Sequence, residues 1–359
     1  MKRIAYVDGL RAVAVLSVAS YHAFAPGHQG SAGAPIGVSL FFVISGFCLA
    51  YPTLSRLSLD GAAQFDVLGY AARRVVRIVP PYYIAIAALV IFAAILTRLG
   101  IPLPRSMPPA GITPVEVVQA IFFLDGHTHY IDWSFWTLPV EFRWYFLFPV
   151  ALWLWTRSPR SFGVVVLALA FVVPLTLASS IDLFVLPAFL LGIVAAHLRV
   201  NGHRYERLAL PLAIILTASA YITSPTFITP LWAAAMFCIV VAAGSFKWIE
   251  AALSWRWLAY VGLASYSIYL VHQPIILFAE GRGCGPVLAL AIGIAVGFGF
   301  WAIAERLFVG NALRNAMIGK LLLLWYTGCS GMGAHLRLRQ VGASAGIERR
   351  VMVSDLRAR

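Results

Sequence analysis

The sequence has 359 residues, of which 61% are apolar and 11% carry a formal charge. Soluble globular chains are about 45–50% apolar and about 25% charged, so this composition excludes an ordinary soluble protein. The 27 lysines and arginines give a net charge of +13. They are scattered singly between apolar runs, which excludes a nucleic-acid binder with one basic face.

Ten apolar runs follow one another along the chain, and most are close to the ~20 residues that cross a hydrocarbon core of about 30 Å. They lie near residues 12–26, 36–51, 80–97, 134–155, 162–178, 183–198, 208–223, 227–245, 258–279 and 286–305. The sequence therefore predicts an all-α integral membrane protein with about ten transmembrane helices. We expect a transmembrane domain over 1–310 and a basic cytoplasmic tail over 311–359, to which no function is assigned.

The positive charges predict the orientation of these spans. With a cytoplasmic N-terminus, eleven basic residues fall on short inside loops and three on outside loops: Arg56, Arg73, Arg74, Arg77, Arg157, Arg160, Arg199, Arg204, Arg207, Lys247 and Arg256 against Arg98, Arg105 and Arg282. This excess agrees with the positive-inside rule, so both termini are predicted to be cytoplasmic.

Prolines inside four of the runs, at Pro139, Pro174, Pro187 and Pro274, favour a bundle around a polar cavity. A membrane helix tolerates a proline only where neighbours or water satisfy the freed carbonyl group. The long outside loop 99–133 is predicted to be irregular structure over the outer mouth of this cavity.

Ionisable groups inside membrane helices are costly and mark function by default. The candidates are Arg11, His22, Glu141, Arg143, His197, His272 and Glu305. Arg11 and His22 are eleven residues apart, about three helical turns, so they share one face about 16 Å apart along the axis. A structural interpretation stays open, with His22 as a satisfied core histidine and Arg11 as an interfacial side chain that snorkels.

The residues His22, Glu141 and His272 lie at comparable depths from the outer ends of their helices. Three titratable groups at one depth can converge on one cavity, and a carboxylate beside an imidazole suits a general base that removes a hydroxyl proton. A purely structural His–Glu pair would have the same sequence pattern. His197, His127 and His129 lie at a helix end or in a loop, where solvated histidines are commoner.

A basic cluster, Arg73, Arg74 and Arg77, precedes the third run. If the segment is helical, Arg74 and Arg77 point the same way below the cytoplasmic membrane face, where guanidinium groups grip phosphates. A cluster that only sets topology is the alternative. The Gly37–Phe47 segment mixes small and bulky residues, which favours close helix packing, and Ser45 is a candidate hydrogen-bond donor near the cavity. The four cysteines show no metal-binding spacing, and no metal is expected.

Five segments together resemble the acyltransferase-3 family of integral membrane acyltransferases, which O-acetylate surface polysaccharides and related glycans. They are Asp8–Arg11 with ten residues between Arg11 and His22, Gly37–Phe47, Arg74–Pro80, Trp133–Glu141 and Ser265–Pro274. The resemblance extends over roughly residues 4–306.

The resemblance implies an acyl-CoA donor, expected to be acetyl-CoA, bound from the cytoplasm near Arg73, Arg74 and Arg77. It implies transfer to a hydroxyl of a glycan or lipid-linked saccharide, with His22 as the catalytic base and Arg11 as its paired motif residue. We expect Glu141 to orient the imidazole, and Ser45, His272, Trp133 and Tyr269 to line the substrate cavity. The location expected is the bacterial inner membrane.

Two alternatives stay open at this point. An acyl-histidine intermediate could replace direct transfer. A membrane carrier or glycan flippase would also need broken helices and intramembrane charges, but it would move its substrate without consuming acyl-CoA. The identity of the acceptor, the length of the acyl chain and the oligomeric state are not predicted.

Overall fold

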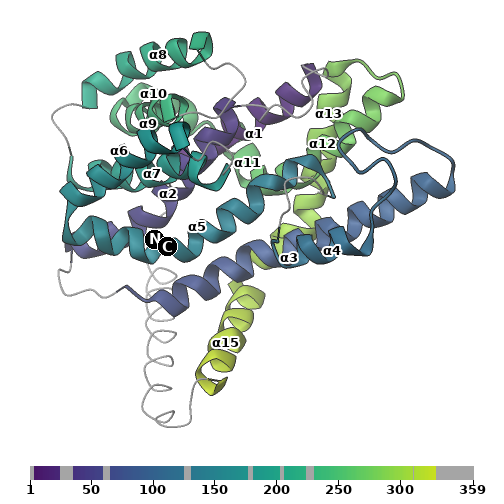
Figure 1. Ribbon diagram of the computed structural model, residues 1–359, viewed down its shortest axis with the longest axis horizontal. Helices are drawn as coiled ribbons and strands as arrows, with labels where there is room; N and C mark the ends of the chain where they lie inside the picture. Colours follow the sequence, from purple (N-terminus) through teal and green to yellow (C-terminus); the bar gives the residue numbers. More distant parts are fainter. Residues whose placement is uncertain are drawn as a thin grey trace, which may run out of the picture.

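The computed structural model describes residues 4–24, 35–59, 65–124, 131–176, 181–202, 206–223, 230–309 and 311–328. Every regular element in these ranges is a helix, and no β-strand occurs among the described residues. Figure 1 shows the helices packed into one bundle, with α1 passing through its middle and α3 along one edge. The all-α prediction is confirmed for this part of the chain.

The helices follow one another with short connections. They are α1 (Ala5–Phe24), α2 (Pro35–Leu59), α3 (Val67–Arg98), α4 (Pro114–Ile121), the 3-10 turn η1 (Trp133–Trp136), α5 (Thr137–Arg157), α6 (Pro159–Thr176), α7 (Ile181–Asn201), α8 (Glu206–Thr223), α9 (Pro230–Ser245), α10 (Lys247–Leu253), α11 (Arg256–Leu263), α12 (Ser265–Gly281), α13 (Pro286–Phe300), the π-helical turn η2 (Trp301–Glu305), α14 (Arg306–Val309) and α15 (Asn311–Gly328).

Each of the ten predicted apolar runs falls on a helix or on a bent pair of helices. Four helical stretches are long and apolar enough to cross a membrane on their own: Ile36–Leu59, Val67–Arg98, Leu183–Asn201 and Pro286–Phe308. The pair α9 and α10, bent by 100°, and the pair α11 and α12, bent by 71°, raise the number to six among the described residues. A multi-pass membrane protein is therefore supported, whereas ten spans and cytoplasmic termini stay predictions.

The third helix begins thirteen residues earlier than its apolar run. The side chain of Asp66 accepts a hydrogen bond from the backbone N–H of Gly69 at 2.8 Å, which caps the helix at Val67. A capped start stabilises a helix because it satisfies one of the free N–H groups of the first turn. The arginine cluster thus lies on the first turns of α3, and the condition that it be helical is met.

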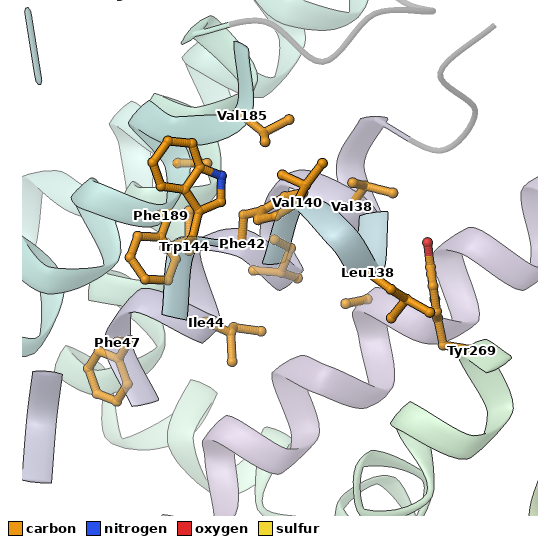
Figure 2. Close-up of a cluster of buried hydrophobic side chains, with 14 of the residues drawn as sticks. Val38, Phe42, Ile44, Phe47, Leu138, Val140, Trp144, Val185, Phe189 and Tyr269 are labelled. Atoms are coloured by element: carbon orange, nitrogen blue, oxygen red, sulfur yellow. The ribbon is translucent and has the colours of Figure 1, made fainter. Parts of the chain in front are cut away.

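The core of the bundle is densest where α2 meets α7 and α5. A Cβ atom at Gly46 would overlap the carbonyl oxygen of Phe189, and one at Gly192 would overlap that of Val43. The two backbones can approach this closely only because glycine has no side chain. Figure 2 shows Phe42, Trp144 and Phe189 from the three helices packed together beside this contact.

The first helix is held between other elements by the same kind of contact. A Cβ atom at Gly9 would overlap the carbonyl oxygen of Leu253 at the end of α10, and one at Gly262 in α11 would overlap that of Asp8. Helix α1 also packs against α2, α12 and α13. Its position along its own axis is therefore fixed at the end that carries Arg11.

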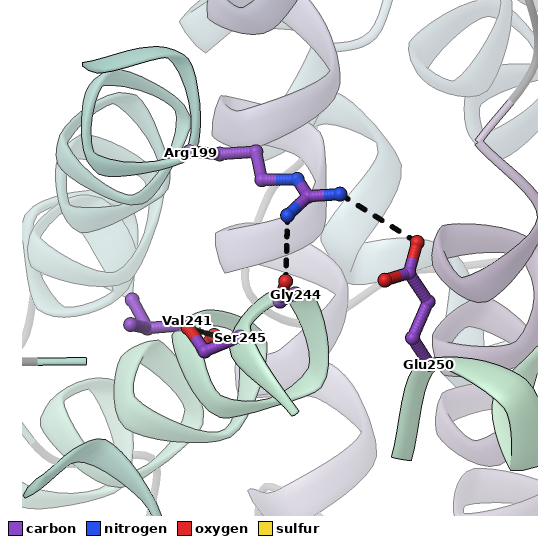
Figure 3. Close-up of polar contacts among 5 residues, drawn as sticks. All are labelled: Arg199, Val241, Gly244, Ser245 and Glu250. Atoms are coloured by element: carbon purple, nitrogen blue, oxygen red, sulfur yellow. Dashed lines mark hydrogen bonds and ion pairs between the residues drawn. The ribbon is translucent and has the colours of Figure 1, made fainter. Parts of the chain in front are cut away.

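Arg199 braces the bend between α9 and α10. Its guanidinium donates a hydrogen bond to the carbonyl oxygen of Gly244 at 2.6 Å, and the second nitrogen lies 3.5 Å from a carboxylate oxygen of Glu250 (Figure 3). The guanidinium carbon also lies 5.7 Å from the ring centroid of Tyr6 on α1. One side chain from α7 thus joins both sides of the bend to α1 through charge, hydrogen bonding and cation–π attraction.

The outer loop is more regular than expected. Thr113 and Glu116 form a capping box at the start of α4, a Thr-x-x-Glu signature that the sequence contains. The prediction of irregular structure is therefore wrong for Pro114–Ile121, while residues 125–130, with His127 and His129, lie outside the described residues. Further along, the fully buried Asp132 caps η1 by accepting hydrogen bonds from the N–H of Ser134 at 3.2 Å and from its hydroxyl.

We expect the substitution Gly46→Ala to lower the melting temperature of the detergent-solubilised protein. The added methyl group forces α2 and α7 apart, and overpacking of this kind costs about 1–3 kcal/mol. Gly163→Ala on α6 is the matched control, because no atom lies within 4 Å of its Cβ position. A melting temperature of the Gly46 variant equal to or above that of the control would contradict the close helix contact.

We expect Asp132 to make stability depend on pH. Burial raises the pKa of this carboxyl from 3.8 to about 6, so the folded state disfavours the ionised form. Its stability is greatest below the unfolded value and falls as the pH rises through the folded one. Relative to wild type, Asp132→Asn should gain about 3 kcal/mol between about pH 4 and about pH 7. The measurement is the difference in melting temperature between the two proteins at each pH, and a difference independent of pH would refute it.

Candidate active site

His22 lies in the last turn of α1, where three side chains surround its ring. The carboxamide nitrogen of Gln273 is 3.3 Å from Nδ1 of His22. The ring centroid of His272 is 5.2 Å away, and that of Tyr21 is 5.6 Å away in an edge-on arrangement. His22 is itself only partly buried, so its ring is shaped by polar neighbours without being fully enclosed.

The neighbouring histidine is fixed from its own helix. Nδ1 of His272 lies 2.8 Å from the carbonyl oxygen of Tyr269 one turn earlier. A carbonyl oxygen can only accept, so Nδ1 carries the proton and Nε2 carries the lone pair. Nε2 is buried and has no hydrogen-bond partner among the described residues. His272 therefore presents a fixed tautomer beside His22.

Tyr269 ties α12 to the turn η1. Its hydroxyl donates a hydrogen bond to the carbonyl oxygen of Ser134 at 2.9 Å and lies 2.7 Å from the hydroxyl of Thr137. Its ring packs edge-on against Phe41 of α2 at 5.9 Å. Trp133 lies in the same turn, but its side chain points to the surface, 38% exposed. The structure thus places Tyr269 inside the bundle and Trp133 at its edge.

Glu141 has partners other than the one expected from its depth. Its carboxylate accepts hydrogen bonds from the hydroxyl of Ser45 on α2 and from that of Tyr145 one turn further along α5. Ser45 is thus confirmed as a hydrogen-bond donor inside the bundle. Because the hydrogen bonds of Glu141 go to these hydroxyls and that of His22 goes to Gln273, the expected contact between the carboxylate and the imidazole does not form.

The arginines of α3 differ in their surroundings. Arg73 is exposed and lies 3.7 Å from the carboxylate of Asp66. Arg74 lies between two aromatic rings, 5.9 Å from the centroid of Tyr70 and 5.7 Å from that of Tyr145. These residues form one wall of a small pocket between α3 and α5, which Phe142 and Pro149 close from the other side. Arg74 is therefore held by the same tyrosine that donates to Glu141.

Arg77 brings a third element into this cluster. It interacts electrostatically with Arg74, with Arg11 of α1 and with Glu305 of η2. Arg11 is only partly buried, and it interacts with Glu305 in turn. Three guanidinium groups from two helices thus surround one buried carboxylate. This arrangement, the arginine cluster of Arg11, Arg74 and Arg77, leaves an excess of positive charge inside the bundle.

Glu305 is the residue whose role the sequence did not reveal. It is 2% exposed and ends the π-helical turn η2. The hydroxyl of Ser267 on α12 donates a hydrogen bond to its carboxylate at 2.6 Å. Single π-helical turns occur frequently at functional sites. The sequence shows only a buried acid near the end of the last apolar run, and its proximity to the arginines depends on the packing of η2 against α3.

The two groups of side chains lie at opposite ends of one straight element. Arg11 and His22 are eleven residues apart on the uninterrupted helix α1, which corresponds to about 16 Å along the axis. Helix α12 runs between the same two regions, with Ser267 near the arginine cluster and Gln273 beside His22. The candidate site is therefore elongated, with an imidazole at one end and a cationic cluster at the other.

Comparison with known proteins agrees with this arrangement. A model of the acyltransferase-3 family, described as an acyltransferase domain, matches residues 4–306. Peptidoglycan O-acetyltransferase OatA of Listeria monocytogenes is 25% identical over 319 residues, which cover 77% of this chain and 50% of the relative. O-acetyltransferase OatA of Staphylococcus aureus is 25% identical over 331 residues, 80% of this chain and 53% of the relative.

The putative peptidoglycan O-acetyltransferase YrhL of Bacillus subtilis is 27% identical over 327 residues, 76% of this chain and 48% of the relative. The chain thus spans about half the length of the curated relatives it matches. No solved structure matches it significantly. Since the family model covers nearly the whole bundle, residues 4–306 of 359, the chain belongs to the acyltransferase-3 family of integral membrane acyltransferases.

Proposed function

We propose that this protein transfers an acyl group, in the first instance acetyl, from cytoplasmic acyl-CoA to a hydroxyl of a glycan or lipid-linked saccharide. The observation that carries the proposal is the elongated site, in which α1 places His22 at one end and Arg11, within the arginine cluster, at the other. The relatives named as O-acetyltransferases support the reaction class. The inner membrane of a bacterium is the proposed location.

The arginine cluster suits the donor. The 3′-phosphate and pyrophosphate of acyl-CoA carry several negative charges, and guanidinium groups bind phosphates through paired, charge-assisted hydrogen bonds. In the protein alone Glu305 balances one of the three positive charges. The remaining excess attracts an anion, and the positive-inside distribution of basic residues puts this end of the site on the cytoplasmic side.

The imidazole suits the acceptor. As the hydroxyl oxygen attacks the thioester carbonyl, His22 accepts the hydroxyl proton. The new C–O ester bond forms, the C–S bond breaks, and the proton passes from His22 to the departing CoA sulfur. His22 thereby returns to its neutral form, and no further reactant is needed.

Glu141 takes a supporting part in this proposal. Its carboxylate holds the hydroxyls of Ser45 and Tyr145, and the ring of Tyr145 lies against Arg74. Glu141 therefore acts on the donor end through Tyr145. Its position differs from the sequence-based expectation of a carboxylate that orients His22, because its hydrogen bonds go elsewhere.

The role of His22 is tested by following radiolabel from acetyl-CoA into glycan in membranes that contain His22→Ala protein. Loss of the general base should reduce the rate about 100-fold or more. His197→Ala, at the inner end of α7, is the matched control and should keep wild-type transfer. Undiminished transfer by the His22 variant would refute the assignment. Movement of glycan across the membrane without consumption of acetyl-CoA would favour a carrier instead.

The role of the arginine cluster is tested with the double substitution Arg74→Gln and Arg77→Gln. The apparent KM for acetyl-CoA should rise about tenfold or more, while that for the acceptor stays nearly constant, because only the donor carries the bound phosphates. The control removes two positive charges of the same predicted inside loops with Arg157→Gln and Arg207→Gln. An equal rise in both KM values, or the same effect in the control, would indicate a topological role alone.

A further inference from the structure

Gln273 is the side chain in closest polar contact with His22, and sequence reasoning assigned it no role. It lies on α12 directly after His272 and is 4% exposed. Its carboxamide nitrogen is 3.3 Å from Nδ1 of His22, and its carboxamide oxygen is buried with no hydrogen-bond partner among the described residues. A buried polar group with an unused end is costly unless it serves a purpose.

The contact at Nδ1 determines which nitrogen of His22 is free to act. A neutral imidazole has one protonated and one unprotonated nitrogen. If the amide N–H of Gln273 donates to Nδ1, then Nε2 carries the proton and cannot accept another. If the carboxamide oxygen accepts from Nδ1–H, then Nε2 keeps its lone pair. Rotation of the terminal amide by half a turn exchanges these two arrangements with the atoms in nearly the same places.

The adjacent histidine cannot take this part. Its Nδ1–H is donated to the carbonyl oxygen of Tyr269, and the ring centroid separation of 5.2 Å from His22 marks a ring contact. Glu141 cannot do so either, since its hydrogen bonds go to Ser45 and Tyr145. Gln273 is thus the residue placed to select the tautomer of His22.

We propose that Gln273 is a positioning residue for His22: its carboxamide oxygen accepts the Nδ1–H hydrogen bond and thereby leaves Nε2 free as the base. The proposal rests on the proposed acyl transfer. It gives a neutral amide the task that a carboxylate performs in many His-dependent enzymes, namely to fix the ring orientation and the tautomer. A neutral partner avoids placing another charge inside the bundle, where an ionised group is costly.

Few ionisable groups surround His22, so a pH profile can report on it. His272 faces it from α12 and Tyr21 adjoins it on α1, while Tyr269 lies beyond His272. Helix α13, which also packs on α1, contains no ionisable side chain, and residues 36–47 of α2 contain none. A new charge at position 273 would therefore act on His22 with little competition.

The experiment compares Gln273→Leu and Gln273→Glu in acetyl transfer from acetyl-CoA to glycan in membranes. The leucine removes the hydrogen bond at similar size, so kcat should fall about tenfold or more while the KM for acetyl-CoA stays nearly constant. The glutamate keeps an acceptor in place and should retain most of kcat. Its carboxylate stabilises the imidazolium, so the acid limb of its pH profile should move to higher pH by about one unit or more.

Gln119→Leu on α4 is the matched control, because its carboxamide oxygen is likewise buried without a hydrogen-bond partner, and it should keep wild-type kcat and pH profile. Melting temperatures identify variants that fail to fold. The proposal is overturned if both Gln273 variants have wild-type kcat, if the glutamate loses more kcat than the leucine, or if both lose activity alike with an unshifted pH profile. Absence of transfer by the wild-type protein would instead reject the proposed function itself.

Discussion

A carboxylate inside an apolar bundle must have hydrogen-bond donors, and in this protein hydroxyl groups provide them. Ser45 and Tyr145 donate to Glu141, and Ser267 donates to Glu305. An unpaired buried charge would cost several kcal/mol, so the helices that carry these hydroxyls are fixed relative to the acids. The polar interior is therefore a set of constraints between α2, α5, α12 and η2, and the candidate site is built on them.

Helix α12 connects the two ends of this site. Within three turns it presents Ser267 to Glu305, the Tyr269 hydroxyl to the backbone of η1, and Gln273 to His22. The Ser265–Pro274 segment that carries the family resemblance thus has a physical explanation, because each of these contacts needs its own residue type on its own face of one helix. The bend of 71° before α12 sets the direction in which these side chains point.

Helix α1 supplies the length of the site. Its backbone touches that of α10 and α11 at Gly9 and Gly262, so it cannot slide without separating the two contacts. Arg11 is thereby held at the arginine cluster, and His22 lies about 16 Å further along, as the rise per residue of an α-helix requires. A long, thin cofactor such as acyl-CoA fits such a separation between a phosphate-binding end and a reacting end, whereas a compact metabolite would not need it.

The sequence by itself determined the all-helical class, the placement of the apolar runs on helices, the shared face of Arg11 and His22, and the family. These follow from local geometry and composition, which depend on neighbours in the chain. Only the tertiary structure decided that Glu141 bonds to Ser45 and Tyr145, that Gln273 contacts His22, and that Glu305 joins the arginine cluster. Depth within a membrane fixes one coordinate of a side chain. The rotation of each helix about its axis and the bends near Phe246 and Ala264 set the others, and both arise from packing between distant segments.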